Sequence, residues 1–98
     1  MIKVALIGIG GMGSVHFDAY KDSKEAKVIA VADVRTDMAR EKVEDESINI
    51  YASLEELLEN EKPDMIDICT PSYLHAELSV RIVLFNFKQT KIFFSHFY

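Results

Sequence analysis

The stretch Ile7-Gly8-Ile9-Gly10-Gly11-Met12-Gly13 decides how this chain of 98 residues folds, because it contains all four of the chain's glycines. It follows the apolar run 2–7 and precedes a segment with helical spacing, and Gly8, Gly10 and Gly13 stand in the register G-x-G-x-x-G. A strand, a glycine-rich turn and a helix in this order are typical of a dinucleotide-binding unit. The first glycine permits the sharp turn, the second lets a pyrophosphate approach the backbone, and the third lets the helix pack against the strand. The helix N-terminus offers its free N–H groups to the phosphates.

An acidic residue after the next apolar run supports this interpretation. The run 27–32 ends at Asp33, twenty residues after Gly13, where the fingerprint requires a carboxylate that accepts hydrogen bonds from the adenosine ribose. The alternative is that Asp33 only terminates a strand. Arg35 could face a 2′-phosphate, or it could be an ordinary solvated loop residue. Because the Asp33 carboxylate would repel a 2′-phosphate, NAD is predicted rather than NADP.

Composition limits the class of protein. The length suits one small domain. The formal net charge of −5 argues against a nucleic-acid or anionic membrane partner, and no run of 18 apolar residues is present to span a membrane. The single cysteine, Cys69, excludes an internal disulfide and suits the reducing cytoplasm. Its apolar neighbours in the sequence predict a small buried hydrophobe rather than a nucleophile.

Strands and helices alternate along the chain. Strands are predicted at 2–7, 27–33, 48–51 and 65–69, with a possible fifth at 91–94, and helices at 11–22, 36–46 and 53–60, with another from Tyr73 or Leu74. The run 53–56 is a capping box at the start of its helix. The alternation predicts an α/β fold with a Rossmann-type parallel sheet in strand order 3-2-1-4. Ligands are expected in the crevice between the first and fourth strands, bordered by the glycine turn and Thr70-Pro71.

Apolar spacing also predicts the inner faces of the first two helices. These faces comprise Met12, Val15, His16, Ala19 and Tyr20 in the first helix, and Met38, Ala39 and Val43 in the second. His16 is expected to be packed or locally hydrogen-bonded, and the run 44–46 to be a solvated helix end. No Cys/His spacing or paired carboxylates indicate a metal or catalytic site.

Residues 82–98 differ in composition from residues 1–81. All 16 acidic residues lie in the first part, whereas five of the six phenylalanines lie in the second. The sequence therefore predicts a dinucleotide-binding domain at 1–81, followed at 82–98 by an atypical aromatic tail or a remnant of the next helix and strand. A fusion scar, a shifted reading frame and a homo-oligomer contact through this tail are the open alternatives.

With these motifs in place, residues 1–81 resemble the N-terminal domain of the Gfo/Idh/MocA family, which includes glucose–fructose oxidoreductase and inositol 2-dehydrogenase. The similarity rests on the segments 4–13 with His16, 31–33, 53–58 and 67–75. It implies a nicotinamide-dependent oxidoreductase that acts on a sugar or cyclitol hydroxyl. The cofactor residues that it implies are Gly8, Ile9, Gly10, Gly11, Met12 and Gly13 at the pyrophosphate, Asp33, Val34 and Arg35 at the ribose, and Thr70, Pro71 and His75 toward the nicotinamide.

The resemblance also implies parts that this sequence lacks. After the helix that begins near His75, the family continues with a glycine turn, a strand and a Glu-Lys-Pro tripeptide whose lysine helps to position and polarise the substrate. Here the residues 82–87 are Ile-Val-Leu-Phe-Asn-Phe, and neither Lys88 nor Lys91 matches that motif. The family's second domain, which supplies the catalytic histidine and the dimer surface, is absent. The chain is therefore expected to be truncated and to carry no catalytic residue, and whether it is an enzyme stays open.

Two functions remain as hypotheses. The first is the dinucleotide-binding domain of a sugar or cyclitol dehydrogenase, which meets its substrate only when a second domain is supplied. The second is a non-catalytic NAD-binding module for sensing or interaction. A fold that binds S-adenosylmethionine shares a glycine loop and an acidic residue after the second strand, but the full G-x-G-x-x-G and Thr70-Pro71 disfavour it.

Overall fold

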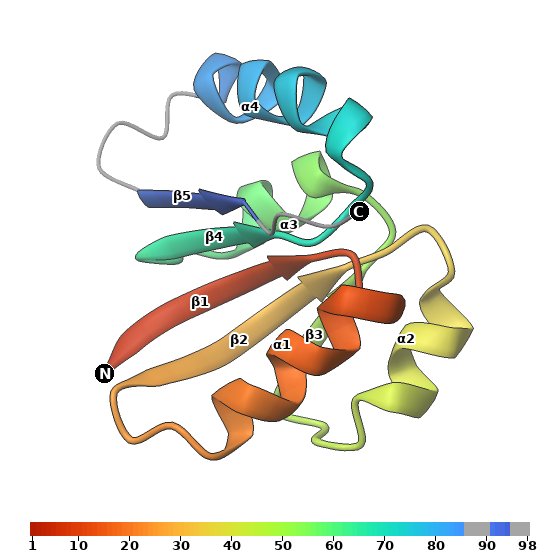
Figure 1. Ribbon diagram of the computed structural model, residues 1–98, viewed down its shortest axis with the longest axis vertical. Coiled ribbons are helices and arrows are strands. Elements are labelled where there is room, and N and C mark those ends of the chain that lie inside the picture. Colours follow the sequence, from red (N-terminus) through yellow and green to blue (C-terminus); the bar gives the residue numbers. More distant parts are fainter. Residues whose placement is uncertain (86–90, 95–98) are drawn as a thin grey trace.

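The computed structural model describes residues 1–85 and 91–94, which form a parallel sheet with helices on both faces (Figure 1). The strands are Ile2–Ile7 (β1), Ala26–Ala32 (β2), Asn49–Tyr51 (β3), Met65–Ile68 (β4) and Lys91–Phe94 (β5). The helices are Gly11–Lys21 (α1), Thr36–Lys42 (α2), Leu54–Asn60 (α3) and His75–Leu84 (α4), with a 3₁₀ turn at Ser72–Leu74 (η1) before α4. The predicted α/β fold is confirmed.

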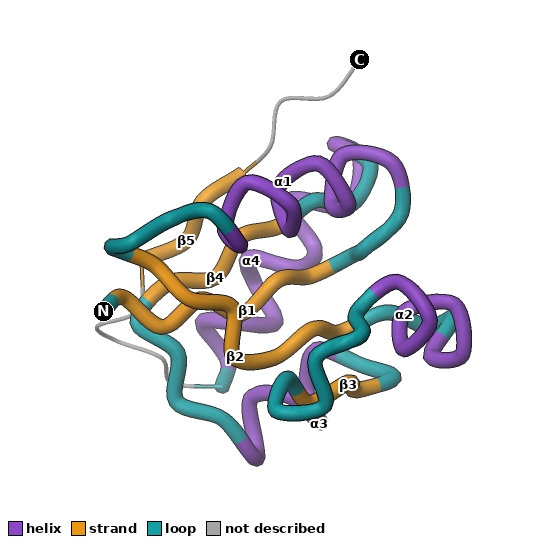
Figure 2. The backbone as a smooth tube through the Cα atoms, turned by 90° about the horizontal axis from the view of Figure 1, so that it is seen from below, coloured by secondary structure: helices purple, strands orange, loops and turns teal. Residues whose placement is uncertain are grey.

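The strand order is β3-β2-β1-β4-β5, and every neighbouring pair is parallel. Figure 2 shows β3 and β5 at opposite edges with β1 in the middle. The predicted order 3-2-1-4 is confirmed, and the possible fifth strand lies beside β4. The strands β2 and β4 lie on either side of β1, so the strand order reverses at β1. Sheets of this kind bind ligands at such a switch point, which is bordered here by the carboxyl ends of β1 and β4.

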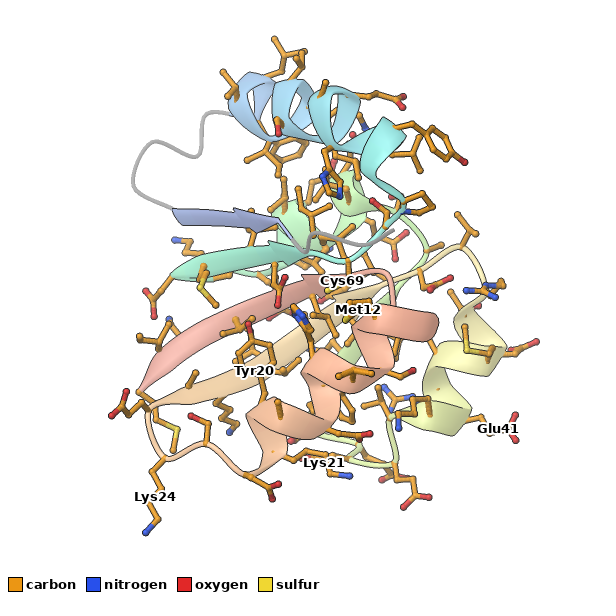
Figure 3. All side chains as sticks on the ribbon, viewed as in Figure 1. Met12, Tyr20, Lys21, Lys24, Glu41 and Cys69 are labelled. Carbon is orange, nitrogen blue, oxygen red and sulfur yellow. The ribbon has the colours of Figure 1, made fainter. Side chains whose placement is uncertain are left out.

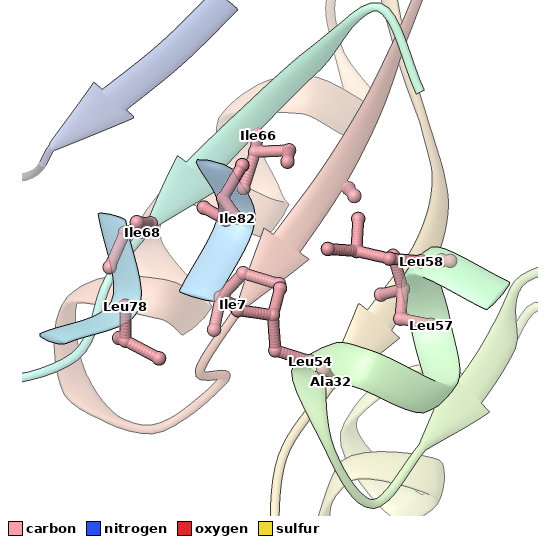
Figure 4. Close-up of a cluster of buried hydrophobic side chains, with 11 residues drawn as sticks. Ile7, Ala32, Leu54, Leu57, Leu58, Ile66, Ile68, Leu78 and Ile82 are labelled. Carbon is pink, nitrogen blue, oxygen red and sulfur yellow. The ribbon is translucent and has the colours of Figure 1, made fainter. Parts of the chain in front are cut away.

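The two faces of the sheet have separate cores. On one face, α3 and α4 pack against the sheet through the residues Leu54, Leu57, Leu58, Leu78 and Ile82, which meet Ile7, Ile66 and Ile68 (Figure 4). On the other face, Phe17 of α1, Ala39 of α2 and Val43, which directly follows α2, form a cluster with Leu6, Val28 and Val31. Since side chains alternate along a strand, β1 supplies Ile7 to one core and Leu6 to the other.

The inner face of α1 differs from the prediction. Phe17 is buried, Met12, His16 and Tyr20 are half-buried, and Val15 and Ala19 are exposed. Gly13 packs so closely on the glycine turn that the helix rotates its Phe17 side toward the sheet. By contrast, the residues predicted for the inner face of the second helix do pack inward, because Ala39 and Val43 are fully buried and Met38 packs against them, although Val43 directly follows the end of α2.

The helix α2 ends at Lys42, four residues before the predicted end at 46. Val43 is extended, and the backbone N–H and hydroxyl of Ser47 both donate to Asp45 Oδ1. The Arg40 guanidinium donates to the carbonyls of Val43, Asp45 and Ile48. A carboxylate that caps its own turn competes with the helix, so the acidic run 44–46 is a connecting loop rather than a helix end.

Elsewhere the predicted bounds agree with the structure to within a residue or two. The helix start that the capping box predicts is confirmed, because Ser53 Oγ accepts the backbone N–H of Glu56 at 3.2 Å and α3 begins at Leu54. The last helix, α4, runs through the predicted domain boundary at 81/82, and Ile82 is buried in its core. The predicted aromatic tail lies partly outside the described residues, since 86–90 and 95–98 are not described.

Candidate functional site

The glycine turn connects β1 to α1 at the carboxyl edge of the sheet. Gly8 has a φ of +91°, which disfavours a residue with a side chain, and its N–H donates to Ala32 O at 2.8 Å. The helix α1 then begins at Gly11 with Gly10 as its N-cap, and no described side chain caps it. Its first N–H groups and its positive dipole end are therefore directed at the edge where β1 and β4 end.

Two further glycines are required by close approach. A Cβ at Gly13 would lie 2.0 Å from Gly8 O, so the backbone of α1 rests directly on the turn. A Cβ at Gly10 would lie 2.8 Å from Arg35 Nη2, which is the end of an exposed side chain. The fold itself therefore requires a glycine at position 13. At position 10 the glycine leaves the backbone accessible to a ligand.

Asp33 lies at the end of β2 and ties that strand to the glycine turn. Its side chain is only 6% exposed. Oδ2 accepts the Ile9 N–H at 3.0 Å, and Oδ1 accepts the Arg35 N–H at 2.9 Å. The Arg35 guanidinium lies 3.5 Å from the same Oδ1 and is 63% exposed. The carboxylate therefore holds the turn in place and still borders the opening that Arg35 partly covers.

The opposite side of the opening is formed by the loop after β4. Thr70 contacts the turn, because a Cβ at Gly8 would lie 3.1 Å from Thr70 Cγ2. The hydroxyl Oγ1 of Thr70 is buried and has no hydrogen-bond partner within the part of the chain that the structure describes. His75 Nε2 lies 3.0 Å from Thr70 O, so this histidine supports the loop from behind. A buried hydroxyl without a partner indicates a group that a ligand can satisfy.

These elements enclose a cavity of about 460 Å³, a size that suits small-molecule and cofactor sites. We call its two sides the glycine wall and the helix wall. The glycine wall consists of Gly8, Gly10, Gly11, Met12, Asp33, Val34 and Arg35. The helix wall consists of Thr70, Pro71, Leu74, Glu77, Leu78 and Arg81. Nine of the predicted cofactor residues therefore line one cavity, whereas Ile9, Gly13 and His75 are not among its lining residues.

The sequence did not predict two parts of the cavity. One is the segment 52–54 after β3, and the other is the inner side of α4. The segment 52–54 follows β3, and the carboxyl ends of parallel strands share one edge of the sheet. The capping box at the start of α3 could therefore have indicated that this segment lies at the cavity. No sequence motif marks the inner side of α4, because α4 reaches the cavity only by packing across the sheet.

An ion pair joins α4 to α3 at the rim of the helix wall. Arg81 Nε and Nη2 donate to the two carboxylate oxygens of Glu55 at 2.6 and 2.5 Å. This bidentate contact lowers the pKa of Glu55 and raises the pKa of Arg81. It orients the guanidinium across the cavity rim.

The parallel order, the glycine turn before α1 and the carboxylate after β2 define a Rossmann-type dinucleotide-binding fold. A family model described as "Oxidoreductase family, NAD-binding Rossmann fold" matches residues 2–90. The chain belongs to this Gfo/Idh/MocA family and corresponds to its NAD-binding domain. The match continues nine residues beyond the predicted end of the resemblance at Arg81.

Relatives of known activity match most of this chain. The myo-inositol 2-dehydrogenase of Thermotoga maritima is 30% identical over 80 residues, which are 81% of this chain and 24% of that protein. The inositol 2-dehydrogenase of Renibacterium salmoninarum is 36% identical over 77 residues, which are 78% of this chain and 23% of that protein. The chain thus spans about a quarter of the length of these curated relatives.

A solved structure agrees with the fold. The WlbA dehydrogenase of Chromobacterium violaceum, solved in complex with NADH and UDP-GlcNAcA, is 30% identical with a TM-score of 0.74. The match covers 88% of this chain and 25% of that one. Within the described residues, no helix of this chain has the length and apolar character needed to cross a membrane.

Proposed function

We propose that this chain binds NAD(H) in the cavity between the glycine wall and the helix wall. The observation that carries the proposal is the turn Gly8–Gly13, which opens α1 toward that cavity with Asp33 at its side. In this assignment the pyrophosphate meets the N–H groups at the start of α1, and Asp33 accepts hydrogen bonds from the adenosine ribose. Thr70 and Pro71 lie on the nicotinamide side.

The residues present fit such a group. Among the described residues the buried Thr70 hydroxyl has no hydrogen-bond partner, and a ribose or phosphate oxygen can supply one. The space over Gly10 holds only the movable end of Arg35, and a dinucleotide displaces a side chain of that kind without a change of fold. The apolar side chains of Leu74 and Leu78 face the same cavity and suit a planar ring.

NAD is favoured over NADP in this proposal because of the charge at the end of β2. A 2′-phosphate near Asp33 would meet a carboxylate that already accepts two backbone N–H groups and is nearly buried. Arg35 offers one exposed guanidinium to such a phosphate, but this guanidinium already lies against the Asp33 carboxylate. The nearest positive charge is therefore partly neutralised before a phosphate arrives.

The activity proposed for the whole protein is oxidation of a sugar or cyclitol hydroxyl, in the cytoplasm. When bound, the nicotinamide supplies hydride transfer, and this chain's own residues hold and orient it. The substrate class follows from the inositol dehydrogenases that match this chain. Since the chain spans about a quarter of their length, substrate binding is assigned to a second domain. Residues 1–81 are proposed as the cofactor domain.

A non-catalytic module is the second candidate. The outer side of α4 exposes Val80, Val83 and Leu84, and the aromatic residues of 82–98 follow directly. An exposed apolar stripe of this kind favours contact with another protein surface or a second copy.

Calorimetric titration of the purified chain with NAD⁺, NADH, NADP⁺ and S-adenosylmethionine tests the proposal. We expect NAD(H) to bind and Asp33→Ala to weaken it by about 1–3 kcal/mol, since charge-assisted ribose bonds are lost. Asp33→Asn separates the two roles of this residue, because it keeps an oxygen that can accept the Ile9 N–H but removes the charge. Glu41→Ala removes an exposed carboxylate from α2 and serves as the matched control.

Two results would contradict the proposal. One is a folded wild-type chain that binds no nucleotide, and the other is an Asp33→Asn chain with the NAD affinity of the control. Stronger binding of NADP⁺ than of NAD⁺ would reverse the assignment of the cofactor alone. Turnover of myo-inositol by the 98-residue chain would exclude the non-catalytic module.

A further inference from the structure

A second cluster of reactive side chains lies between α1 and β4, and one of its members, Cys69, also lines the cavity. Its centre is Asp67, the only charged side chain among the described residues that is fully buried. His16 Nδ1 lies 2.7 Å from Asp67 Oδ2, and the Tyr20 hydroxyl donates to the same oxygen at 2.8 Å. The Cys69 thiol donates to Asp67 Oδ1 at 3.4 Å and lies 3.6 Å from His16 Nδ1. Tyr20 and Cys69 are labelled in Figure 3.

The fold brings these residues together from distant parts of the sequence. Asp67 and Cys69 are two residues apart at the end of β4, so their side chains point to the same face of the sheet. That face is covered by α1, where His16 and Tyr20 are four residues apart and share one side of the helix. The spacing of a sequence motif could not reveal this cluster, because 51 residues separate His16 from Asp67.

The donor atoms have the separations of a metal-ligand set. One nitrogen, one oxygen and one sulfur from His16, Asp67 and Cys69 lie within 4.8 Å of one another. In tetrahedral zinc sites with metal–ligand bonds of about 2.0–2.3 Å, neighbouring ligand atoms lie roughly 3.3–3.6 Å apart. The distances from Cys69 Sγ to Asp67 Oδ1 and to His16 Nδ1, 3.4 and 3.6 Å, agree with this value. His16 Nδ1 lies 2.7 Å from the other carboxylate oxygen, Oδ2, so a small rotation of the carboxylate or of the imidazole is needed to bring one oxygen to about 3.3 Å from the nitrogen.

We propose that His16, Asp67 and Cys69 form a binding site for a divalent cation of the zinc type. A thiolate, an imidazole and a carboxylate are ligands that Zn²⁺ accepts together. A cation also balances the charge of a carboxylate that is shielded from water. This site differs from the sequence-based expectation of no metal, and one of its ligands, Cys69, also lines the cavity proposed for NAD.

The surroundings support the site in two ways. The Tyr20 hydroxyl already donates to Asp67 Oδ2, which is the outer contact that orients a ligating carboxylate. The His16 side chain is 24% exposed, so an ion and a water molecule as its fourth ligand have a route from the solvent. The ion would therefore link β4 to α1, the helix that begins at the glycine turn.

Titration of the purified, tag-free chain with Co²⁺ tests this proposal with a direct signature. A cobalt–thiolate bond gives a charge-transfer band, and Cys69 is the only cysteine in the sequence, so the band reports this residue alone. We expect the band to saturate at one ion per chain and to disappear when Zn²⁺ is added. A folded chain without the band would overturn the proposal.

Variants identify the other two ligands. His16→Gln and Asp67→Asn should each reduce the Co²⁺ affinity at least tenfold, and Tyr20→Phe by about 10–100-fold as an outer contact. Glu41→Gln, which changes an exposed carboxylate on α2 outside the cluster, should leave the titration unchanged. If His16→Gln and Asp67→Asn bind Co²⁺ as the wild type does, the three-ligand site is wrong.

A measurement on the wild type avoids the risk that these variants fail to fold. Zn²⁺ should slow alkylation of the Cys69 thiol at least tenfold, and EDTA should restore the rate of the metal-free chain. An alkylation rate that Zn²⁺ leaves unchanged would contradict thiolate coordination.

Discussion

The two walls of the cavity are built by different means. The glycine wall is held by contacts to the backbone, because Gly13 of α1 rests on Gly8 O and the Asp33 carboxylate accepts the Ile9 N–H. In the helix wall the contacts are between side chains, since α4 is held by apolar packing and by the Arg81–Glu55 pair. A wall made of backbone contacts has little freedom to adapt, whereas a wall made of side chains can tolerate substitution.

This difference predicts that one methyl group added behind the glycine wall lowers the free energy of unfolding more than the loss of an ion pair at the helix wall does. A backbone that is in contact with another backbone cannot move aside locally. Side chains at the edge of a helix rearrange and exchange their partners with water. Three substitutions test this contrast, in order of decreasing effect.

Gly13→Ala should have the largest effect. The new Cβ would lie 2.0 Å from Gly8 O and 2.8 Å from Gly8 C, so α1 must move away from the turn. We expect a loss of about 3 kcal/mol or more in the free energy of unfolding, at the upper end of overpacking. Thermal denaturation followed by circular dichroism should show a fall in Tm of more than about 12 °C.

The control is Gly11→Ala, two residues earlier in α1, where an added Cβ has no neighbour within 4 Å. Its stability should stay the same or rise by up to about 1 kcal/mol, because alanine favours the helix. Equal stability of the two variants would show that the turn is adaptable and would remove the contrast between the walls.

Gly10→Ala should separate folding from binding. Its Cβ would meet only Arg35 Nη2, the end of an exposed side chain that can swing away, so the Tm should change little. The methyl group would occupy the space through which the pyrophosphate reaches the backbone. We expect the NAD affinity to fall at least tenfold, about 1.4 kcal/mol, in calorimetric titrations.

Glu41→Ala, which changes an exposed residue of α2 away from the cavity, provides the comparison and should bind NAD as the wild type does. An unchanged affinity in Gly10→Ala would mean that the dinucleotide does not approach this part of the glycine wall.

Arg81→Gln should have the smallest effect. Both partners of the Arg81–Glu55 pair are about a third exposed, so water screens the contact and its loss should lower the free energy of unfolding by less than about 1 kcal/mol. The pair lowers the pKa of Glu55. Its contribution is therefore complete above the ordinary glutamate pKa of about 4.3 and is lost as the pH falls through the lower folded value.

Urea denaturation of the wild type and of Arg81→Gln at several pH values measures this contribution. The difference between them should be constant near neutral pH and should vanish in acid. A difference that persists after Glu55 is protonated would mean that Arg81 acts by packing rather than by charge.

The elements that carry strong local signals could be predicted from the sequence. The bounds of β1 and α1, the cap at Ser53 and the strand order follow from periodicity, turn residues and the handedness of crossovers. The end of α2 could not be predicted, because it depends on Arg40 reaching three carbonyls further along the chain. The exposure of Val15 was missed because the close contact at Gly13 sets the rotation of α1.

The sequence by itself predicted the fold class and the glycine turn, because periodicity and turn residues are local signals that leave few alternatives for the backbone. Only the tertiary structure decided the rest. It placed Leu78 and Arg81 of α4 across the cavity from the turn, and it left the Thr70 hydroxyl buried without a partner among the described residues. It also gathered His16, Asp67 and Cys69 into one cluster. These contacts join segments that are distant in sequence, and packing across a sheet leaves no periodic signal in the residues that it brings together.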